Sequence, residues 1–263
     1  MIDRVRILSD LHLEFAGFLI PPLPEDETTV LILAGDVSVD SGAAAFIHLQ
    51  CRRFAKVVYV LGNHEHYHGD FQETKNKLLK ALAQFDLSDL VIVVDDATKI
   101  EFDGFRILAG TLWTDMNNND VLTHSTVGSH LYDFRVVKNG GKDTKFTTED
   151  AVIEFVSTVQ RFTKWLEEPY TGQTFIATHH LPSDSAVDPQ FADSYHMNGG
   201  FRSNLDDFIK KYSPDVWFFG HTHSSCDIML HQTRLVCNPR GYPRRNGSHE
   251  NTEFNPTLTI KLD

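Results

Sequence analysis

The stretch KVVYVLGNHEHYH, residues 56–68, joins an apolar run to a dense group of polar side chains. Its first six residues have the length and the β-branched and aromatic content of a buried strand. Directly behind them come Gly62, Asn63, His64 and Glu65. One histidine at a strand end would need no explanation, but an amide, several imidazoles and a carboxylate together indicate a ligand-binding site there.

Four other apolar runs end in residues of the same kinds. Asp10 and His12 follow 5–8, Gly35 and Asp36 follow 29–34, His179 and His180 follow 174–178, and Gly220, His221 and His223 follow 216–219. In an open α/β sheet the carboxyl ends of the strands lie along one edge, where ligands bind. Side chains two apart on an extended segment point the same way, so each D-x-H or H-x-H pair is expected to reach one point. The glycines before three of the motifs are expected to allow a sharp turn and a close approach of the backbone.

Short apolar runs and the helical patterns between them indicate an α/β protein. The runs cover residues 5–8, 29–34, 56–61, 90–94, 105–110, 174–178, 216–220, 233–237 and 257–262. Four helices are expected. Their predicted starts are Ser41, the capping box of Asp70 and Glu73, Thr148, and Ser203. The first part thus has the order β-α-β-α-β, which predicts parallel pairing in a layered α/β fold. The last runs lack intervening helices, which allows antiparallel pairing there.

Two long polar segments interrupt this alternation, at residues 114–147 and 181–202. Both are longer than an ordinary connection, and such loops often form lids or substrate walls. His196 and Asn198 in the second segment are candidates for the wall of a pocket. Since no linker or repeat divides the chain, we expect a single domain over residues 1–263.

Composition limits the partners and the cellular compartment. The formal net charge of −12 argues against binding duplex nucleic acid through the general field of the protein. The three cysteines form no C-x-x-C pair, which indicates a reducing compartment and no disulfide framework. No apolar run approaches the ~20 residues of a membrane span. We therefore expect a cytoplasmic protein without a membrane partner, whose oligomeric state stays open.

The candidate ligands are carboxylate, imidazole and amide groups, with no thiolate. Such a set favours Mn²⁺, Fe²⁺, Co²⁺, Ni²⁺ or Zn²⁺ in an open site over a structural tetrahedral zinc. Seven candidate ligands are too many for one ion with open positions, but they suit two ions that share a bridging carboxylate. A single motif of this kind is weak evidence, because a lone histidine is more often structural or solvated. Five such motifs in order, each behind an apolar run, are difficult to attribute to chance.

The ordered set Asp10-x-His12, Gly35-Asp36, Gly62-Asn63-His64-Glu65, His179 and Gly220-His221-x-His223 resembles the calcineurin-like metallophosphoesterases over almost the whole chain. The resemblance implies an α/β fold of two packed mixed β-sheets flanked by α-helices. It also implies a site for two divalent metal ions, and Mn²⁺ is the metal we favour. One would be held by Asp10, His12 and His223, the other by Asn63, His179 and His221, with Asp36 as the bridge. His64 would bind no metal and would face the scissile phosphate, while Glu65 would support the loop by accepting hydrogen bonds.

The activity implied by the resemblance is the hydrolysis of phosphate esters. A hydroxide that bridges the metals would attack phosphorus, and protonated His64 would assist the leaving oxygen. The phosphoprotein phosphatase branch continues its Gly-Asp motif with Asp-Arg-Gly, whereas this chain continues Gly35-Asp36 with VSVDSG. Small phosphodiesters, including nucleotides, are therefore favoured over phosphomonoesters and phosphoproteins. The alternative from another class is a non-catalytic binding scaffold, but such proteins usually lose ligands or the catalytic histidine.

Some polar residues near these motifs have no assigned role. His66 and His68 are expected in an outer shell or on the surface, and His180 either contacts substrate or points away. Arg240, Arg244 and Arg245 form the one basic cluster, which is either a phosphate clamp or, as we slightly prefer, a solvated loop. Cys226 is expected to be packed and unreactive.

Overall fold

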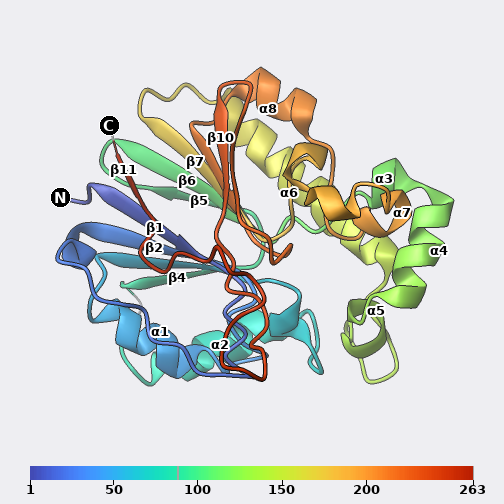
Figure 1. The fold of residues 1–263 in the computed structure, drawn as a ribbon, viewed down its shortest axis with the longest axis horizontal. Coiled ribbons are helices and arrows are strands. Elements are labelled where there is room, and N and C mark those ends of the chain that lie inside the picture. Colours follow the sequence, from blue (N-terminus) through green and yellow to red (C-terminus); the bar gives the residue numbers. More distant parts are fainter. Residues whose placement is uncertain (88, 263) are drawn as a thin grey trace.

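In the computed structural model, which describes residues 1–87 and 89–262, two β-sheets form the centre of the molecule (Figure 1). The first sheet has the strand order β11-β1-β2-β3-β4. Its strands are β1 (Arg4–Leu8), β2 (Thr29–Ala34), β3 (Lys56–Val60), β4 (Val91–Val94) and β11 (Thr259–Lys261). β1 to β4 are parallel, and β11 pairs antiparallel with β1 at the edge.

The second sheet has the order β5-β6-β7-β8-β10-β9. Its strands are β5 (Thr98–Glu101), β6 (Phe105–Gly110), β7 (Gln173–Thr178), β8 (Val216–Phe219), β9 (Cys226–Leu230) and β10 (Thr233–Cys237). The four inner strands are parallel, while β5 and β9 pair antiparallel at the two edges. Both sheets are mixed, so the expected architecture is confirmed.

Two strands escaped the sequence analysis because they are edge strands. β5 has one buried residue among four, and β9 has none among five. Neither strand therefore forms the continuous apolar run that marks an inner parallel strand. The pairing of β10 with β8 is parallel even though no helix joins them. Antiparallel pairing at this end of the chain is confined to β9 and β11.

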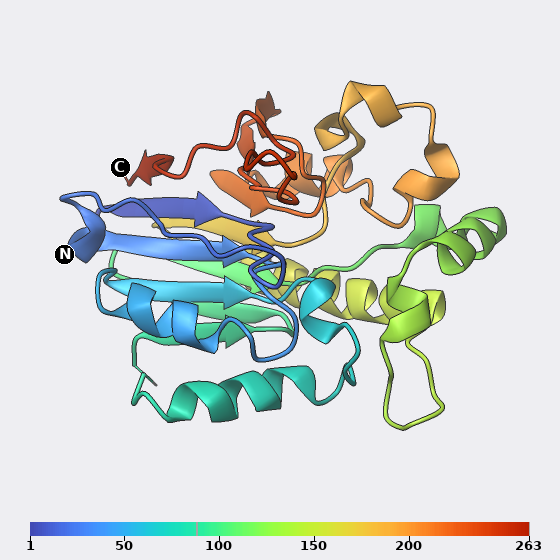
Figure 2. The same cartoon turned by 60° about the horizontal axis from the view of Figure 1, so that its bottom comes forward.

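Residues alternate between two apolar layers along each inner strand. In β2, Val30 and Ile32 face the core between the sheets, while Leu31 and Leu33 face outward. The outer face of the first sheet is covered by α1 (Ala44–Cys51) and α2 (Thr74–Ala83). That of the second is covered by α6 (Thr148–Glu167) and α8 (Asp206–Tyr212). Both faces of each sheet are thus buried, which explains why the strands read as unbroken apolar runs. Figure 2 shows the resulting four layers from a second side.

Helix α6 begins at Thr148, as expected, with a capping box formed by Thr147 and Asp150. The other expected caps differ. The Asp70 carboxylate caps no helix and instead accepts N–H bonds from Gln72 and from two glycines of a distant loop. No side chain caps α1 or α8. The Ser203 hydroxyl accepts the N–H of Asp115 instead of opening α8. The predictions for Asp70 and Ser203 were wrong because distant partners take these side chains.

The two polar segments contain short helices that lie beyond the carboxyl ends of the strands (Figures 1 and 2). Residues 114–147 form α3 (Met116–Asn119), α4 (Val121–His130) and α5 (Asp133–Val136). Residues 181–202 form the 3₁₀ turns η3 (Asp184–Ala186) and η4 (Pro189–Phe191) and then α7 (Tyr195–Asn198). All four residues of α3 have positive φ, between 51° and 62°, so this element is a left-handed turn. Asparagine tolerates that conformation better than most residues, which suits the MNNN sequence.

The two segments pack directly against each other. A Cβ atom at Gly200 would lie 2.7 Å from Leu131 Cδ1 and 2.9 Å from Val127 Cγ1, so only glycine fits there. The buried Arg202 side chain donates to the Asn117 amide oxygen and pairs with Asp184. The first segment is therefore tied to the second by both close packing and buried polar contacts.

Two expectations from composition can be compared with the structure. None of the helices in residues 1–87 and 89–262 is long and apolar enough to cross a membrane. Cys51, Cys226 and Cys237 are all unpaired. Burial raises the pKa of the Cys226 thiol to about 11, which agrees with a packed, unreactive cysteine.

Candidate metal centre

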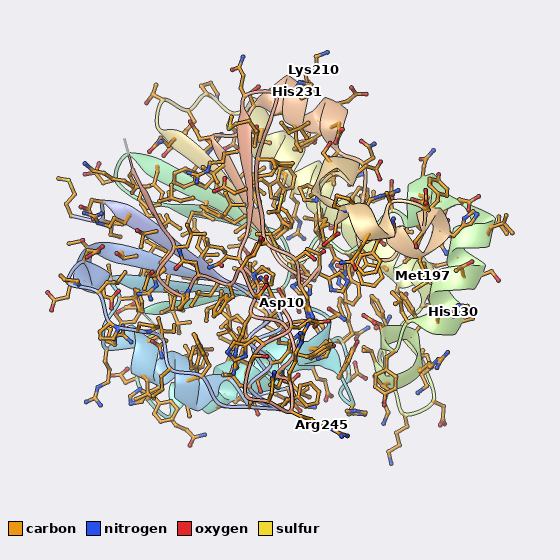
Figure 3. All side chains as sticks on the ribbon, in the orientation of Figure 1. Asp10, His130, Met197, Lys210, His231 and Arg245 are labelled. Atoms are coloured by element: carbon orange, nitrogen blue, oxygen red, sulfur yellow. The ribbon has the colours of Figure 1, made fainter. Side chains whose placement is uncertain are left out.

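The five motifs meet where the carboxyl ends of the two sheets come together. Asp10 and His12 follow β1, Asp36 follows β2, Asn63 and His64 follow β3, His179 follows β7, and His221 and His223 follow β8. Strands of both sheets thus contribute to one site. Figure 3 labels Asp10, which lies near the middle of the view. All seven predicted ligands lie in this cluster, and His64 lies beside them.

The backbone at this site is strained. Five of the seven candidate ligands have positive φ, namely Asp10 (51°), His12 (46°), Asp36 (54°), His221 (72°) and His223 (51°). Such a conformation costs on the order of 1–3 kcal/mol for a residue other than glycine and persists only where its surroundings enforce it. Asp10 and His12 reach one point, but through backbone turns and not through extended alternation, whereas His221 and His223 lie in different groups, so the prediction for that pair was wrong. At five of the seven ligands such a turn directs the side chain into the site.

The glycines in three motifs are required by close approach. A Cβ at Gly35 would lie 2.2 Å from His179 Nδ1, and one at Gly62 would lie 2.2 Å from Asp36 Oδ1. A Cβ at Gly220 would lie 2.8 Å from Asp10 Oδ2. Only Gly35 also has a positive φ, of 85°. Close approach is confirmed at all three glycines, but a left-handed turn occurs at one.

One group of side chains consists of Asp10, His12 and His223. The Nε2 atoms of His12 and His223 are 2.9 Å apart, and His223 Nε2 is 3.4 Å from Asp10 Oδ1. The Asp10 carboxylate also accepts the backbone N–H of His221 at 3.0 Å. These three side chains are the set that the family resemblance assigns to one metal.

The second group consists of Asp36, Asn63, His179 and His221. His179 Nε2 lies 2.9 Å from Asn63 Oδ1, 3.1 Å from His221 Nδ1 and 3.4 Å from Asp36 Oδ1. Asp36 Oδ2 points the other way, 3.9 Å from His64 Nε2. Asp36 therefore lies between the second group and His64.

Three of the histidines are held by a hydrogen bond at Nδ1. His179 donates to the carbonyl of Ala34 at 2.9 Å, His223 to Glu250 at 2.7 Å and His12 to Glu14 at 3.2 Å. An oxygen acceptor requires the proton to be on Nδ1, so it leaves Nε2 free to bind a metal. Each ring is thus fixed both in orientation and in tautomer.

These side chains require positive charge between them, which makes the donor set fit two divalent cations. With protons on both Nδ1 atoms, the Nε2 lone pairs of His12 and His223 face each other at 2.9 Å. Burial opposes protonation, but Asp10 and Glu250 raise the pKa of His223 to about 10. Asp36 likewise outweighs burial and raises the pKa of His179 to about 9. A metal ion at either position would supply the charge that these carboxylates favour.

His64 is buried beside the two groups and forms a third set of potential ligands with Glu14 and His12, the last of which it shares with the first group. Its Nδ1 donates to Glu14 Oε1 at 3.1 Å, and its ring stacks on Tyr67. Its Nε2 faces the pocket, 3.1 Å from the hydroxyl of Tyr242. Burial disfavours a charge on this ring, but Asp36 and Glu14 outweigh it and raise the pKa of His64.

Sequence reasoning missed three residues of the site. Glu14 accepts from both His12 and His64, and although burial opposes it, these bonds lower the pKa of Glu14 to about 2. The continued i, i+2 spacing from Asp10 through His12 to Glu14 could have revealed it. Tyr242 covers the ring of His12, and Glu250 orients His223, but both come from the loop after β10 and carry no motif.

Glu65 supports the loops of the site, as predicted. Its buried carboxylate accepts the backbone N–H groups of Asp36 at 3.0 Å and Val37 at 2.7 Å. It also accepts the N–H of Gly62 at 2.6 Å and the hydroxyl of Tyr59 at 2.5 Å. One side chain therefore holds the loops that follow β2 and β3 at a fixed distance.

Three further histidines lie outside the ligand groups. His66 is fully buried against Phe71, and burial lowers its pKa to about 3, so it is a neutral core residue. His68 is exposed. His180 is buried behind His221, with ring centroids 4.4 Å apart, and does not line the pocket. The possible substrate contact at His180 is thus not supported.

The three arginines of the basic cluster have different environments. Arg240 is only 3% exposed and donates to the carbonyls of Leu11 and Ala16, so the solvated loop predicted there was wrong. It holds the segment that carries His12 and is not a phosphate clamp. Arg245 is exposed, as expected. Arg244 is exposed as well, but it lines the pocket beside the metal centre.

Both ligand groups open onto a pocket of about 780 Å³. Its lining combines Asp36, Asn63, His64, His221 and His223 with residues from both polar segments. Asn198 is one of these residues, whereas His196 pairs with Asp120 and is not part of the lining. A volume in this range accommodates a small organic ligand.

Comparisons with known proteins agree with this arrangement. Residues 4–225 match the family model for calcineurin-like phosphoesterases. No curated protein gives a significant match. Among solved structures, the chain is similar to the phosphopantetheinyl hydrolase of Mycobacterium tuberculosis, with a TM-score of 0.70 and 20% identity over 92% of this chain and 90% of that one.

Two more distant structures show weaker similarity. One gives a TM-score of 0.52 at 12% identity over 91% of each chain. The other, a putative 5′-nucleotidase from Staphylococcus aureus, gives 0.44 at 12% identity over 93% of this chain and 49% of that one. At these identities the similarities above 0.5 concern the fold alone.

Proposed function

Because the chain belongs to the calcineurin-like phosphoesterase family, and so to the metal-dependent phosphoric ester hydrolases, we propose that it hydrolyses small phosphodiesters at a centre of two metal ions. The observation that carries the proposal is the convergence of seven ligand-type side chains beside His64 on one pocket. Asp10, His12 and His223 would hold one ion, Asn63, His179 and His221 would hold the other, and Asp36 would be shared by both. When bound, the two ions lower the pKa of a water nucleophile and stabilise charge on the phosphoryl oxygens.

His64 acts as the general acid that protonates the leaving oxygen. Glu14 fixes the proton on Nδ1, so Nε2 is directed into the pocket, where the Tyr242 hydroxyl contacts it at 3.1 Å. A protonated Nε2 donates its proton as the P–O bond breaks. General acid catalysis of this kind contributes roughly 10²–10⁴-fold to a rate.

The charge of the pocket favours diesters over monoesters. Among the described residues that line it, Arg244 is the sole lysine or arginine, while Asp36, Asp133 and Glu250 are acidic. A phosphodiester carries one negative charge near neutral pH, whereas a phosphomonoester carries nearly two. Besides the two metal ions, the lining offers the second charge of a monoester only Arg244 as a basic partner, against three acidic side chains.

We propose Mn²⁺ as the native metal, since nitrogen and oxygen ligands without thiolate suit it. Elemental analysis of protein purified without added metal should find about two equivalents per chain. Dialysis against a chelator should abolish turnover, and Mn²⁺ should restore it better than Mg²⁺ or Ca²⁺. Restoration by Mg²⁺ alone would contradict this choice.

The substrate class is tested by comparing kcat/KM for bis-p-nitrophenyl phosphate, p-nitrophenyl phosphate and a phosphoserine peptide with the Mn²⁺-loaded protein. The diester should be preferred by about tenfold or more, which corresponds to about 1.4 kcal/mol. Asp36→Asn protein purified in parallel controls for a contaminating phosphatase. Preference for the monoester or the peptide would reverse the ranking, and metal binding without turnover of any ester would identify a binding scaffold.

A further inference from the structure

The pocket extends from the metal centre along the two polar segments, where its lining becomes apolar. Six side chains form this surface, which we call the arm wall: Leu131, Tyr132, Val187, Phe191, Met197 and Phe201. Phe191 and Tyr132 remain 47% and 48% exposed, although both are large and apolar. In Figure 3 the labelled Met197 and His130 lie together on this side, away from Asp10. Exposed aromatic side chains on a concave surface mark a binding site more often than a solvated one.

Polar groups beside the arm wall are already occupied within the protein. The Asn198 amide donates to the carbonyl of Phe191 at 2.8 Å, and the Gln190 amide donates to Asp188 at 3.1 Å. Asp133 accepts the hydroxyl of Tyr67 at 3.1 Å. The wall therefore offers apolar contact and few free hydrogen-bonding groups to a ligand.

Positive charge is also missing from this side of the pocket. Arg244 comes from the loop after β10, where it donates to the carbonyl of Glu250 and stands beside the metal centre. None of the arm-wall residues is charged, and the pocket lining beside them includes Asp133 and His130 but no lysine or arginine. A second phosphate on the substrate would face the wall without a countercharge, at considerable cost.

The arm wall is a built surface held by interactions behind it. Gly200 brings α7 against Leu131, and Arg202 links Asn117 to Asp184 behind the wall. Asn117 donates in addition to the carbonyl of Tyr195 at 3.0 Å. Because Asn117 and Arg202 are buried, the apolar side chains are presented in a fixed arrangement before a ligand arrives.

We propose that the arm wall binds one ester arm of the substrate, and that this arm is extended, uncharged and largely apolar. This inference rests on the proposed function, because the metal centre takes the phosphodiester that carries the arm. It names the substrate class as singly charged phosphodiesters with a neutral arm, and it excludes nucleic-acid fragments and polyphosphates. Phe191 and Tyr132 then act as specificity-determining residues that take no part in breaking the P–O bond.

The test uses three p-nitrophenyl phosphodiesters with the same leaving group and different second arms: methyl, hexyl and 5-carboxypentyl. From methyl to hexyl, kcat/KM should rise roughly tenfold to a hundredfold, since each methylene removed from water contributes up to about fourfold. The rise should appear mainly in KM. The 5-carboxypentyl ester has the same reach with an added charge, so it should fall back to about the value of the methyl ester.

Substitutions on the wall make the test specific. Phe191→Ala should remove most of the hexyl preference, because it should lower kcat/KM for the hexyl ester much more than kcat/KM for the methyl ester. Phe191→Arg should invert the preference between the hexyl and the 5-carboxypentyl ester. Leu122→Ala is the matched control, because Leu122 is 62% exposed on α4 but does not line the pocket. Circular dichroism and metal content should match wild type in all three variants.

The outcomes separate this inference from the proposed function. If the methyl ester is not hydrolysed by Mn²⁺-loaded protein, the proposed function fails. If all three esters are hydrolysed with equal kcat/KM, the proposed function stands, but the substrate-binding role of the arm wall is contradicted. A preference for the 5-carboxypentyl ester in wild type, or an unchanged hexyl preference in Phe191→Ala, would overturn it equally.

Discussion

The strand-end side of the pocket is lined by polar and charged side chains, whereas the side formed by the two polar segments is lined mainly by apolar ones. At the strand ends, Asp10, His12, Asp36, His64 and His179 are buried. The Nδ1 atoms of His12, His179 and His223 each have an oxygen partner. On the arm wall the side chains are apolar and half-exposed. Under the two proposals above, the reactive groups lie where the two sheets fix their positions, whereas selectivity lies on the loop segments outside the sheets.

The strand-end side also carries strain that the arm wall does not. Asp10, Asp36 and His221 are among the ligands with positive φ. Their conformation is stable because Glu65 and the glycines fix the loops around them. Changes on this side should therefore reduce turnover of every ester, whereas changes on the wall should reduce turnover of some esters only.

The largest effect is expected from Asp36→Asn, which tests whether the strand ends act as one metal centre. Loss of the shared carboxylate charge should reduce the bound metal and abolish turnover of methyl and hexyl esters alike. Elemental analysis and kcat/KM check both points. Two full equivalents of metal with normal rates would remove Asp36 from the bridge.

His64→Ala is the next largest change and should separate acid catalysis from metal binding. We expect a loss of ~10²–10⁴-fold on an alkyl or nucleotide ester and a distinctly smaller loss on a nitrophenyl ester, because a basic leaving group needs the proton most. Metal content should remain that of wild type. Equal losses across the leaving-group series would mean that His64 orients the phosphate, and loss of one metal would make His64 a ligand.

Glu14→Gln should give a smaller loss, of about 10–100-fold, the range typical of residues that hold a ligand or catalytic side chain in place. The neutral amide no longer fixes the His64 tautomer, so the loss should grow with the basicity of the leaving group. Glu250→Gln is the matched control, since Glu250 holds His223 in the same way. It should weaken metal binding without changing the leaving-group dependence, and identical behaviour of the two variants would contradict the role assigned to Glu14.

The smallest effect is expected from Arg202→Met, which loosens the arm wall from behind. Loss of the links to Asn117 and Asp184 should raise KM for the hexyl ester several-fold and leave kcat for the methyl ester unchanged. Limited proteolysis should cut residues 184–202 faster than in wild type. Arg245→Met, at an exposed arginine, should change neither measurement. An equal loss on both esters would show that the two sides of the pocket are not independent.

Sequence alone identified which side chains converge, because the carboxyl ends of parallel strands must share an edge. Asp10, Asp36, Asn63, His179 and His221 all follow buried strands, so their apolar runs and their order along the chain were sufficient. The mixed pairing of both sheets came from the family resemblance, since the edge strands β5 and β9 lack an apolar run. The support by Glu65 was also visible in the motif.

Tertiary structure alone decided how these groups are held and what they face. Glu14, Tyr242 and Glu250 join the site through contacts that no local pattern encodes, and Tyr242 reaches His64 across 178 positions of sequence. Arg240 was misjudged because its carbonyl acceptors lie more than 200 residues away, on the segment that carries His12. A local sequence pattern predicts helices, strands and turns. The hydrogen-bond partners of a polar side chain depend instead on which distant segments the fold brings together. The arm wall is the clearest case, because its apolar residues are scattered through two polar segments and form a surface only when those segments pack.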